Sequence, residues 1–291
     1  MKGAVLKGAV LKGAVLKGAV LKGAVLKGAV LKTLSFITGL VLALWLIAVS
    51  FMVVLSAPVT HVLADMTVDT SGSIHSHEYL VSIAEAARAF SLGDDAAPIP
   101  QGTDDRIAFT PDVIGHLLDV RGVFIAAIVF FWVITTATIV VLVLNVLVMR
   151  SSKLVKHAAN YTTAANAVND TVSCKTAENP LDVSGIKLYV KVRRRLGFAL
   201  IAAGCFPLSL CIVFALIGLL AFDALFAWMH GIFFTEGSWQ FSYDSLLIRA
   251  LPQDFWMGCA AVWAVTLVIL CLLSIGIGIL IRRSYRKSMP T

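Results

Sequence analysis

The chain has 291 residues, of which 59% are hydrophobic and only 14% are charged, and its formal net charge is +7. Soluble domains usually carry about 25% charged residues, so this composition argues against a soluble globule and indicates a chain that lies mostly in a membrane. The basic residues gather beside apolar runs and form no basic, aromatic-interleaved surface, so we expect no nucleic-acid partner.

The chain begins with a repeat. After Met1 come six copies of KGAVL and a final Lys32. A period of five matches neither a helix, in which each lysine would advance by about 500°, nor one face of a strand. A lysine at the centre of a membrane costs about 2.5–3.5 kcal/mol, so the repeat is not a span. We interpret residues 1–32 as a low-complexity segment, either a disordered expansion or an artefact, and exclude them from functional arguments.

Residues 33–291 form the predicted membrane domain, which holds four apolar runs long enough to cross a bilayer as helices. These runs are Leu34–Ser56, Val123–Met149, Leu196–Phe222 and Met257–Ile281. The first run is longer than the apolar core of a signal peptide, and Pro58 follows it closely. We therefore predict that it is retained as the first span.

The segments between the spans alternate in charge. Residues 57–122 and 223–256 are acidic, whereas the N-terminal segment, residues 150–195 and the C-terminal tail are basic. Basic segments stay on the cytoplasmic side of a membrane. The sequence thus predicts an all-α integral membrane protein with four transmembrane helices, both termini inside, a cytoplasmic loop at 150–195 and two structured external loops.

Two helices are predicted in external loop 57–122. After His75-Ser-His77-Glu78, apolar residues recur at helical spacing from Tyr79 to Phe90, and a Gly/Asp/Pro-rich stretch at 93–102 ends the pattern. The second helix should begin at Pro111, with Thr110 as its cap.

The face of this second helix carries a histidine beside carboxylates. Asp112, His116 and Asp119 share one face by their spacing, immediately before the second span. A carboxylate one turn away can fix the tautomer of a histidine and stabilise its cationic form.

External loop 223–256 is rich in aromatic residues, which suit the level of lipid headgroups. These residues are Trp228, Phe233, Phe234, Trp239, Phe241, Tyr243 and Phe255, with Phe226 and Trp256 at the edges of the loop. The loop holds one histidine, His230, which lies close to a predicted span on the same side as His116. Any chemistry should therefore occur at the outer leaflet.

Several classes of activity are disfavoured. No Asp, Glu, Lys, Arg or His lies inside the four predicted spans, which argues against an ion channel or a proton-coupled transporter. No GxSxG elbow is present, and Cys259 lies in apolar sequence that should keep its thiol inert. The five cysteines show no CxxC spacing and predict no disulfide framework.

A zinc site is conceivable from histidines on the external side. His75, His77, His116 and His230 together with Asp119 are ligand types that zinc accepts, but their spacing fits no zinc signature. We predict no metal and no cofactor.

Two external motifs carry a family resemblance. Phe109-x6-His116-Leu-Leu-Asp119-Val120-Arg121 stands before the second span. The second loop reads His230, Phe233-Phe234, Gly237-Ser-Trp239-Gln-Phe241 and Asp244-Ser-Leu-Leu-Ile248-Arg-Ala-Leu251-Pro252-Gln-Asp-Phe255. This pattern resembles a family of bacterial four-span proteins that includes the lipoprotein intramolecular transacylase. In topology the resemblance extends from Leu34 to the C-terminus, and it is specific in these two loops.

The resemblance implies an acyl transfer at the external face of a bacterial plasma membrane, in a multi-pass protein. The sn-2 acyl chain of a diacylglyceryl-cysteine lipoprotein would move to the α-amino group of the same cysteine, giving a lyso-form lipoprotein. The implied catalytic pair matches His116 and His230, and the implied partners are the lipidated N-terminus of a lipoprotein and membrane lipids.

Histidines of near-neutral pKa can take a proton from the amine and return one to the leaving alkoxide without a protein nucleophile. Which histidine does which is left open. We expect Asp119 to orient His116. The predicted substrate-binding residues are Arg121, Trp239, Asp244 and Arg249.

Other functions stay open beside this one. A non-catalytic scaffold or accessory protein for lipoproteins or membrane enzymes would depend on the aromatic residues more than on the histidines. A metal-dependent lipid hydrolase would lose its activity to a chelator. A paralogous transacylase could use another outer-leaflet lipid.

Overall fold

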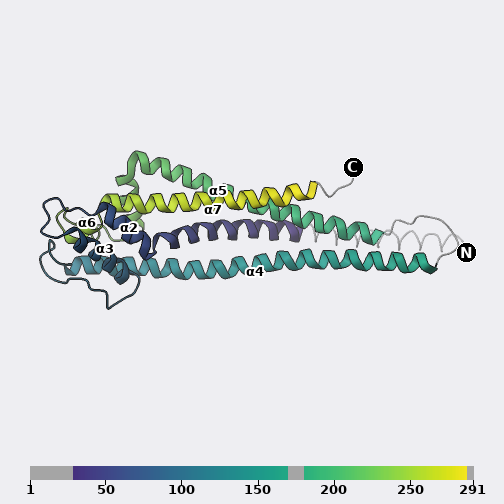
Figure 1. The fold of residues 1–291 in the computed structure, drawn as a ribbon, viewed down its shortest axis with the longest axis horizontal. Helices are drawn as coiled ribbons and strands as arrows, with labels where there is room; N and C mark the ends of the chain where they lie inside the picture. The colour runs from purple at the N-terminus through teal and green to yellow at the C-terminus, as the bar shows by residue number, and fades with distance from the viewer. Residues whose placement is uncertain (1–28, 170–179, 287–291) are drawn as a thin grey trace, which may run out of the picture. The chain divides into compact units, whose positions relative to one another are not determined.

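A computed structural model describes the backbone of residues 29–169 and 180–286, with side chains except for those of 151–189 and 284–286. Every named element in these residues is a helix, and the only strand-like feature is an isolated bridge between Gln101 and Phe109. Four of the helices are long and apolar enough to cross a membrane (Figure 1). The prediction of an all-α protein with four such helices is confirmed. The repeat up to residue 28 and Cys174 lie outside the described residues.

Three of the four long helices extend beyond the predicted spans at both ends, whereas the first begins earlier than predicted and ends two residues before Ser56. The first runs from Ala29 to Val54. The others are α4 (Pro111–Asn169), α5 (Pro180–Phe233) and α7 (Gln253–Arg286). Helix α4 starts at Pro111 as its cap sequence predicts, and it continues past Met149 because residues 150–169 contain no glycine or proline to stop it. Much of the segment 150–195 is therefore helix.

The chain divides into two compact units. The helix unit comprises residues up to 42, 138–202 and 275 onward, and the loop unit comprises residues 43–137 and 203–274.

Small and polar residues bring helices together inside the helix unit. Asn145 Nδ2 donates to Thr38 Oγ1 at 2.9 Å and to the carbonyl of Val141 at 2.8 Å, and both Asn145 and Thr38 are buried. A Cβ on Gly278 would lie 2.7 Å from the carbonyl oxygen of Gly197, so α5 and α7 cross where only glycine fits. Close backbone approach of this kind drives helix association in lipid, where apolar burial contributes little.

The loop unit contains three short helices. These are α2 (Ala57–Thr67), α3 (His77–Ser91) and α6 (Leu246–Ala250). Ser76 caps α3 by accepting a hydrogen bond from the backbone N–H of Tyr79, and Ser245 caps α6 in the same way through Ile248. The helix predicted after His75 is confirmed as α3.

Segments 57–122 and 223–256, the two loop segments, share one apolar core, here called the loop core. It consists of buried side chains from α2, α3, α6, the first two turns of α4, the start of α7 and the connections between these helices. Leu80, Phe109 and Leu246 are fully buried in it. Burying one such side chain stabilises the fold by about 1.5–3 kcal/mol. A helix as short as α6 is not stable alone, so this core is what holds it.

Polar contacts also join the two loop segments. The N–H of Leu246 donates to the carbonyl of Asp105 at 2.7 Å, and the N–H of Asp69 donates to the carbonyl of Arg249 at 3.0 Å. The buried Arg249 guanidinium donates to the carbonyl of Ser71 at 2.7 Å and to the Asp244 carboxylate at 2.7 Å. Loop segment 223–256 is thereby fixed against loop segment 57–122.

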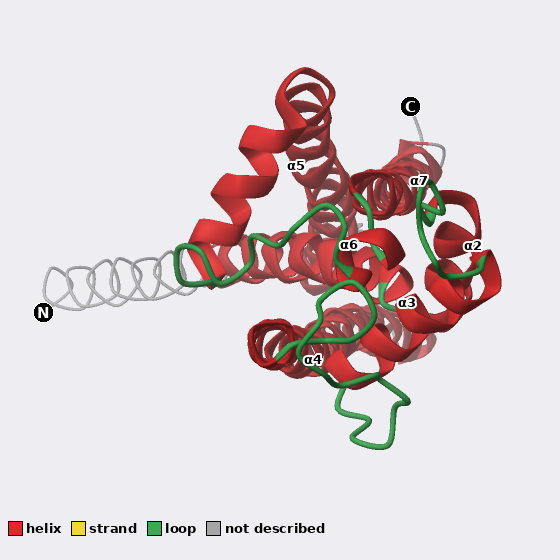
Figure 2. Cartoon of the chain, turned by 90° about the vertical axis from the view of Figure 1, so that its left-hand side faces the viewer, coloured by secondary structure: helices red, strands yellow, loops and turns green. Residues whose placement is uncertain are grey.

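Helix α5 changes direction within the loop unit. Ala221 has φ −153° and ψ 55°, outside the helical region, and Figure 2 shows the two limbs of α5 meeting at an angle. Asp223 follows in the first turn of the second limb, where a carboxylate is favoured by the positive end of a helix. The second limb, Phe222–Phe233, carries His230 near its end.

Candidate active site

Two buried histidines face each other in the loop unit. His116 lies in the second turn of α4, and His230 lies in the last turn of α5. Their ring centroids are 6.3 Å apart and the ring planes differ by 23°. Only 9% of His116 and 7% of His230 is exposed. Residues separated by more than a hundred positions in sequence are thus brought into one site.

The ring of His230 has a defined hydrogen bond. Its Nδ1 lies 2.9 Å from the carbonyl oxygen of Phe226, one turn earlier in the same limb of α5. A carbonyl only accepts, so Nδ1 carries the proton in the neutral ring and Nε2 carries the lone pair. This nitrogen is equipped to accept a proton.

His116 differs, because its Nδ1 is buried without a hydrogen-bond partner in the described part of the chain. A buried N–H without an acceptor is rarer in proteins than an acceptor without a donor. The ring proton is therefore better placed on Nε2, from where it can be donated.

Aromatic rings enclose both imidazoles. Phe226 and Trp239 have centroids 3.9 and 4.7 Å from that of His230. Phe234 lies 4.9 Å from His116 and 5.4 Å from His230, and Phe241 lies 5.7 Å from His116. The sequence predicts these rings to be interfacial anchors and predicts a site role for Trp239 alone. The i, i+4 spacing of Phe226 and His230 in the sequence indicates that Phe226 lies beside His230 on one face of a helix.

Two other predicted site residues, Asp119 and Arg121, are not hydrogen-bonded to the histidine pair in the part of the chain that the structure describes. Asp119 is exposed and makes no hydrogen bond to His116 in the described structure. Arg121 donates to the carbonyl of Phe90 at 2.9 Å and to Asp95 at 2.6 Å, while its Nη2 is buried without a partner in the described chain. The structure therefore brings Trp239 to the histidine pair and joins Asp119 and Arg121 to it by no hydrogen bond.

Asp244 and Arg249 are engaged with their own chain. They pair with each other, and Arg249 also lies 3.5 Å from Asp69. The backbone N–H and the side chain of Ser71, followed by the Arg249 charge, lower the pKa of the Asp69 carboxyl below its usual range. These residues hold the loop segments together around the site.

His75 and His77, which were also considered as zinc ligands, have partners elsewhere. His75 stacks on Tyr79 at 4.7 Å and bonds to the carbonyl of Arg106, while His77 pairs with Asp65 at 3.0 Å. Among the described residues, no group of three or more His, Cys, Asp or Glu side chains gathers as a metal site would require.

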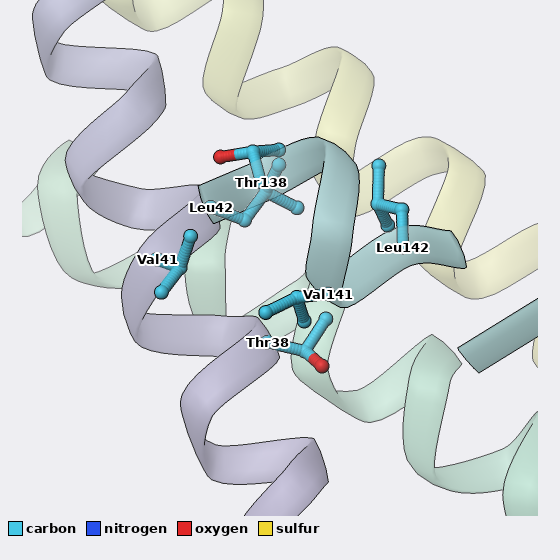
Figure 3. Close-up of a pocket in the computed structure, with 6 residues that line it drawn as sticks. All are labelled: Thr38, Val41, Leu42, Thr138, Val141 and Leu142. Carbon is cyan, nitrogen blue, oxygen red and sulfur yellow. The ribbon is translucent and has the colours of Figure 1, made fainter. Parts of the chain in front are cut away.

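One crevice lies apart from the histidines, within the helix unit. Figure 3 shows Thr38, Val41 and Leu42 of the first helix opposite Thr138, Val141 and Leu142 of α4. Its empty volume is about 140 Å³, with no room for a water molecule. It is a seam between two packed helices, and we assign no chemistry to it.

Comparisons with known proteins identify the family. The family model described as "Lipoprotein intramolecular transacylase Lit" matches residues 30–256. The chain belongs to this family. Members are acyltransferases that act on lipoproteins, and the resemblance drawn from the two external motifs is confirmed. A model for pentapeptide repeats in eight copies matches residues 1–32.

Solved structures of Lit from Bacillus cereus share the fold. One described as the membrane integral lipoprotein intramolecular transacylase is 12% identical, with a TM-score of 0.56 over 90% of this chain and 100% of that one. Two variants of it, with a histidine replaced by arginine or by alanine, give TM-scores of 0.57 and 0.60, also at 12% identity. They cover 92% and 91% of this chain and 99% and 100% of theirs. No curated protein sequence matches the chain.

Proposed function

We propose that this Lit family member moves the sn-2 acyl chain of a diacylglyceryl-cysteine lipoprotein onto the α-amino group of the same cysteine. The product is an N-acylated lyso-form lipoprotein. The observation that supports this proposal best is the buried, aromatic-lined pairing of His116 with His230 at 6.3 Å.

The chemistry needs one proton acceptor and one proton donor. The amine nitrogen attacks the sn-2 ester carbonyl, a C–N bond forms, and the C–O bond to the glyceryl oxygen breaks. His230 Nε2 takes the proton from the amine, because its Nδ1–H is committed to the carbonyl of Phe226. His116 donates from Nε2 to the glyceryl alkoxide as it leaves, and proton exchange between the rings or with solvent restores the pair.

The enclosure of the site is proposed to contribute to catalysis alongside the acid and the base. Nucleophile and ester belong to one substrate molecule, so the site has to orient them and exclude water, which would hydrolyse the ester. Trp239, whose ring is 4.7 Å from that of His230, is proposed to pack against the glyceryl unit or an acyl chain.

The charged residues take secondary roles in this proposal. Asp119 lies one turn beyond His116. Its negative charge stabilises the positive charge of whichever histidine holds the extra proton, without a hydrogen bond. The unpartnered Nη2 of Arg121 is available to an acidic or carbonyl group of the lipid. Arg249 and Asp244 act indirectly, because their ion pair helps to hold the second loop segment over the site.

We also propose that the site faces the outside of a bacterial plasma membrane, with both chain termini in the cytoplasm. The alternation of basic and acidic segments supports this orientation. The partners would be the lipidated N-terminus of a lipoprotein and the surrounding lipids.

A lipopeptide labelled with deuterium in its sn-2 chain tests the reaction. Incubated with the purified protein, it should yield the labelled chain as an amide on cysteine and a free sn-2 hydroxyl, both visible by mass spectrometry. Free labelled fatty acid would instead indicate a hydrolase. An unchanged lipopeptide, with the protein shown to be folded, would support the non-catalytic scaffold.

A further inference from the structure

The histidine pair is covered by the side chains around it. A catalytic base has to come within about 3 Å of the proton that it removes, yet both imidazoles are more than nine-tenths buried. Phe226 lies directly against His230, with ring centroids 3.9 Å apart. At least one covering element has to move before a diacylglyceryl group can enter.

The second limb of α5, here called the arm (Phe222–Phe233), is built for such a movement. It follows the break in helical geometry at Ala221, so it can turn there without breaking its own hydrogen bonds. Its less exposed residues recur at helical spacing and share the face of the helix that carries Phe226 and His230: Phe222, Leu225, Phe226, Met229 and His230. Moving the arm would move both His230 and the ring that covers it.

The outer face of the arm is apolar as well. Trp228, Ile232 and Phe233 are 59%, 57% and 54% exposed, and after Asp223 the arm carries no acidic side chain. An apolar face without a protein partner suits acyl chains better than water. The arm therefore separates the histidine pair from lipid.

Few contacts tie the arm to its surroundings. Gln253 Nε2 at the start of α7 donates to the exposed carboxylate of Asp223 at 2.7 Å. Phe226 lies 6.1 Å from Trp256 by ring centroids. Leu225 packs over Gly218, where an added Cβ would lie 3.8 Å from Cδ2 of that leucine. One exposed hydrogen bond and a few ring contacts, including the contact of His230 with Trp239, form a weak attachment for a helix of this length.

We propose that the arm is a lateral gate. It pivots at Ala221, parts from α7 at the contact between Asp223 and Gln253, and admits the acyl chains of a lipid from the bilayer to the histidine pair. The identity of the lipid rests on the proposed function, whereas the movement of the arm does not.

Cross-linking tests the movement without reference to activity. The variant Asp223→Cys/Gln253→Cys, in lipid nanodiscs, is joined by a short, reductant-cleavable thiol cross-linker. Carbethoxylation of His116 and His230 by diethyl pyrocarbonate is then followed by mass spectrometry. The cross-link should slow modification of both histidines by about tenfold or more, because reagent reaches them only through the opened state. Reductant should restore the rate.

A matched pair provides the control. His61→Cys/Glu85→Cys replaces a contact of 2.8 Å between α2 and α3, away from the arm. Cross-linking there should leave modification of His116 and His230 unchanged. Equal rates before and after cross-linking Asp223→Cys to Gln253→Cys would overturn the gate.

A milder variant covers the case in which the double variant does not fold. Gln253→Ala removes the exposed contact, and exposed pairs are worth up to about 1 kcal/mol. Modification of both histidines should then rise, by up to about fivefold. A rate equal to that of the native protein would contradict a gate held by this contact.

Turnover of the labelled lipopeptide separates the two proposals. Cross-linking should abolish N-acylation and reductant should restore it. If the native protein forms no N-acyl product while histidine modification still responds to the cross-link, the proposed function fails and the gate stands. If the cross-linked protein turns the lipopeptide over at the native rate, lipid entry past the arm is refuted.

Discussion

The carbonyl of Phe226 fixes how His230 can act. Because that oxygen accepts from Nδ1 at 2.9 Å, the opposite nitrogen is left with its lone pair, and the ring orientation is set by the same limb of α5 that positions the histidine. His116 lacks such a partner within the described chain, and its ring is held by the walls of the site instead.

Alanine at either histidine should abolish most of the activity. A positioned acid or base contributes about 10²–10⁴-fold to a rate, so His116→Ala and His230→Ala should each lower N-acylation of the lipopeptide by this order. His61→Ala is the matched control, since that histidine is exposed and bonded to Glu85. Near-native rates for both site variants would rule out the histidine mechanism.

The sequence identifies the histidine pair only through its motifs. Helical spacing places Asp119 on the same face as His116, yet the structure joins them by no hydrogen bond, because spacing fixes a face and leaves the rotamer undetermined. The partner that does orient a histidine here is a backbone carbonyl, at Phe226, and every residue type carries one. Such a contact has no signature in sequence.

Acid should weaken the junction of the loop segments. Bonds to Ser71 and the charge of Arg249 lower the pKa of Asp69 in the folded protein. A lowered folded pKa stabilises the fold above the unfolded pKa of about 3.9, and this stabilisation is lost as pH falls through the folded value. Asp69→Asn should therefore flatten the fall in unfolding temperature below about pH 4 in detergent. A slope identical to that of the native protein would contradict this role.

At the scale of helices, two glycines of α7 that lie two positions apart differ in whether they contact another helix. A Cβ on Gly278 would meet the carbonyl of Gly197 at 2.7 Å, whereas a Cβ on Gly276 would meet nothing within 4 Å. Overpacking costs about 1–3 kcal/mol, so Gly278→Ala should lower the unfolding temperature measurably. Gly276→Ala, the matched control, should not. Equal effects of the two variants would mean that this crossing is unimportant.

The loop core should be equally sensitive to truncation. Leu246 of α6 is fully buried, and removing most of a buried leucine costs about 2–5 kcal/mol. Since α6 cannot persist alone, Leu246→Ala should loosen loop segment 223–256, seen as faster proteolysis there. Tyr243→Ala changes a side chain that is 89% exposed and should leave proteolysis unchanged. Equal cleavage of the native protein and Leu246→Ala would contradict a structural role for this core.

Elements were predictable to different degrees. Caps and apolar spacing indicate α3 and the start of α4, as the structure confirms. The five-residue α6 depends on long-range burial, which local pattern does not contain. The break in α5 falls at Ala221. Alanine, unlike proline or glycine, does not indicate a break in a helix, so the position of this break was not predictable from the sequence.

At the scale of the whole molecule, the pattern of apolar runs in the sequence predicts most of the fold. A spanning backbone must satisfy its own polar groups, so long apolar runs become helices, and the four predicted spans lie in long helices except for the last two residues of the first span. The ends of these helices were less predictable, because polar residues outside a membrane continue a helix as readily as they end it. The match to Lit structures at 12% identity shows that the arrangement tolerates wide change in sequence.

The proposed orientation is testable in intact cells. Tyr243→Cys, in the second external segment, should react with a membrane-impermeant maleimide added outside. Arg150→Cys should react only after the membrane is opened, and the native protein gives the background of its own five cysteines. Labelling of Arg150→Cys alone in intact cells would reverse the proposed topology.

One measurement addresses the central claim most directly. A lipoprotein is expressed in a bacterial host that lacks N-acylation, with this protein, with His116→Ala, with His230→Ala, or with none of them, and its N-terminal peptide is analysed by mass spectrometry. We predict that only the native protein converts the diacylglyceryl peptide with a free amine into an N-acylated peptide with one remaining O-acyl chain. An unchanged peptide beside abundant native protein in the membrane, or full conversion by both histidine variants, would contradict the account.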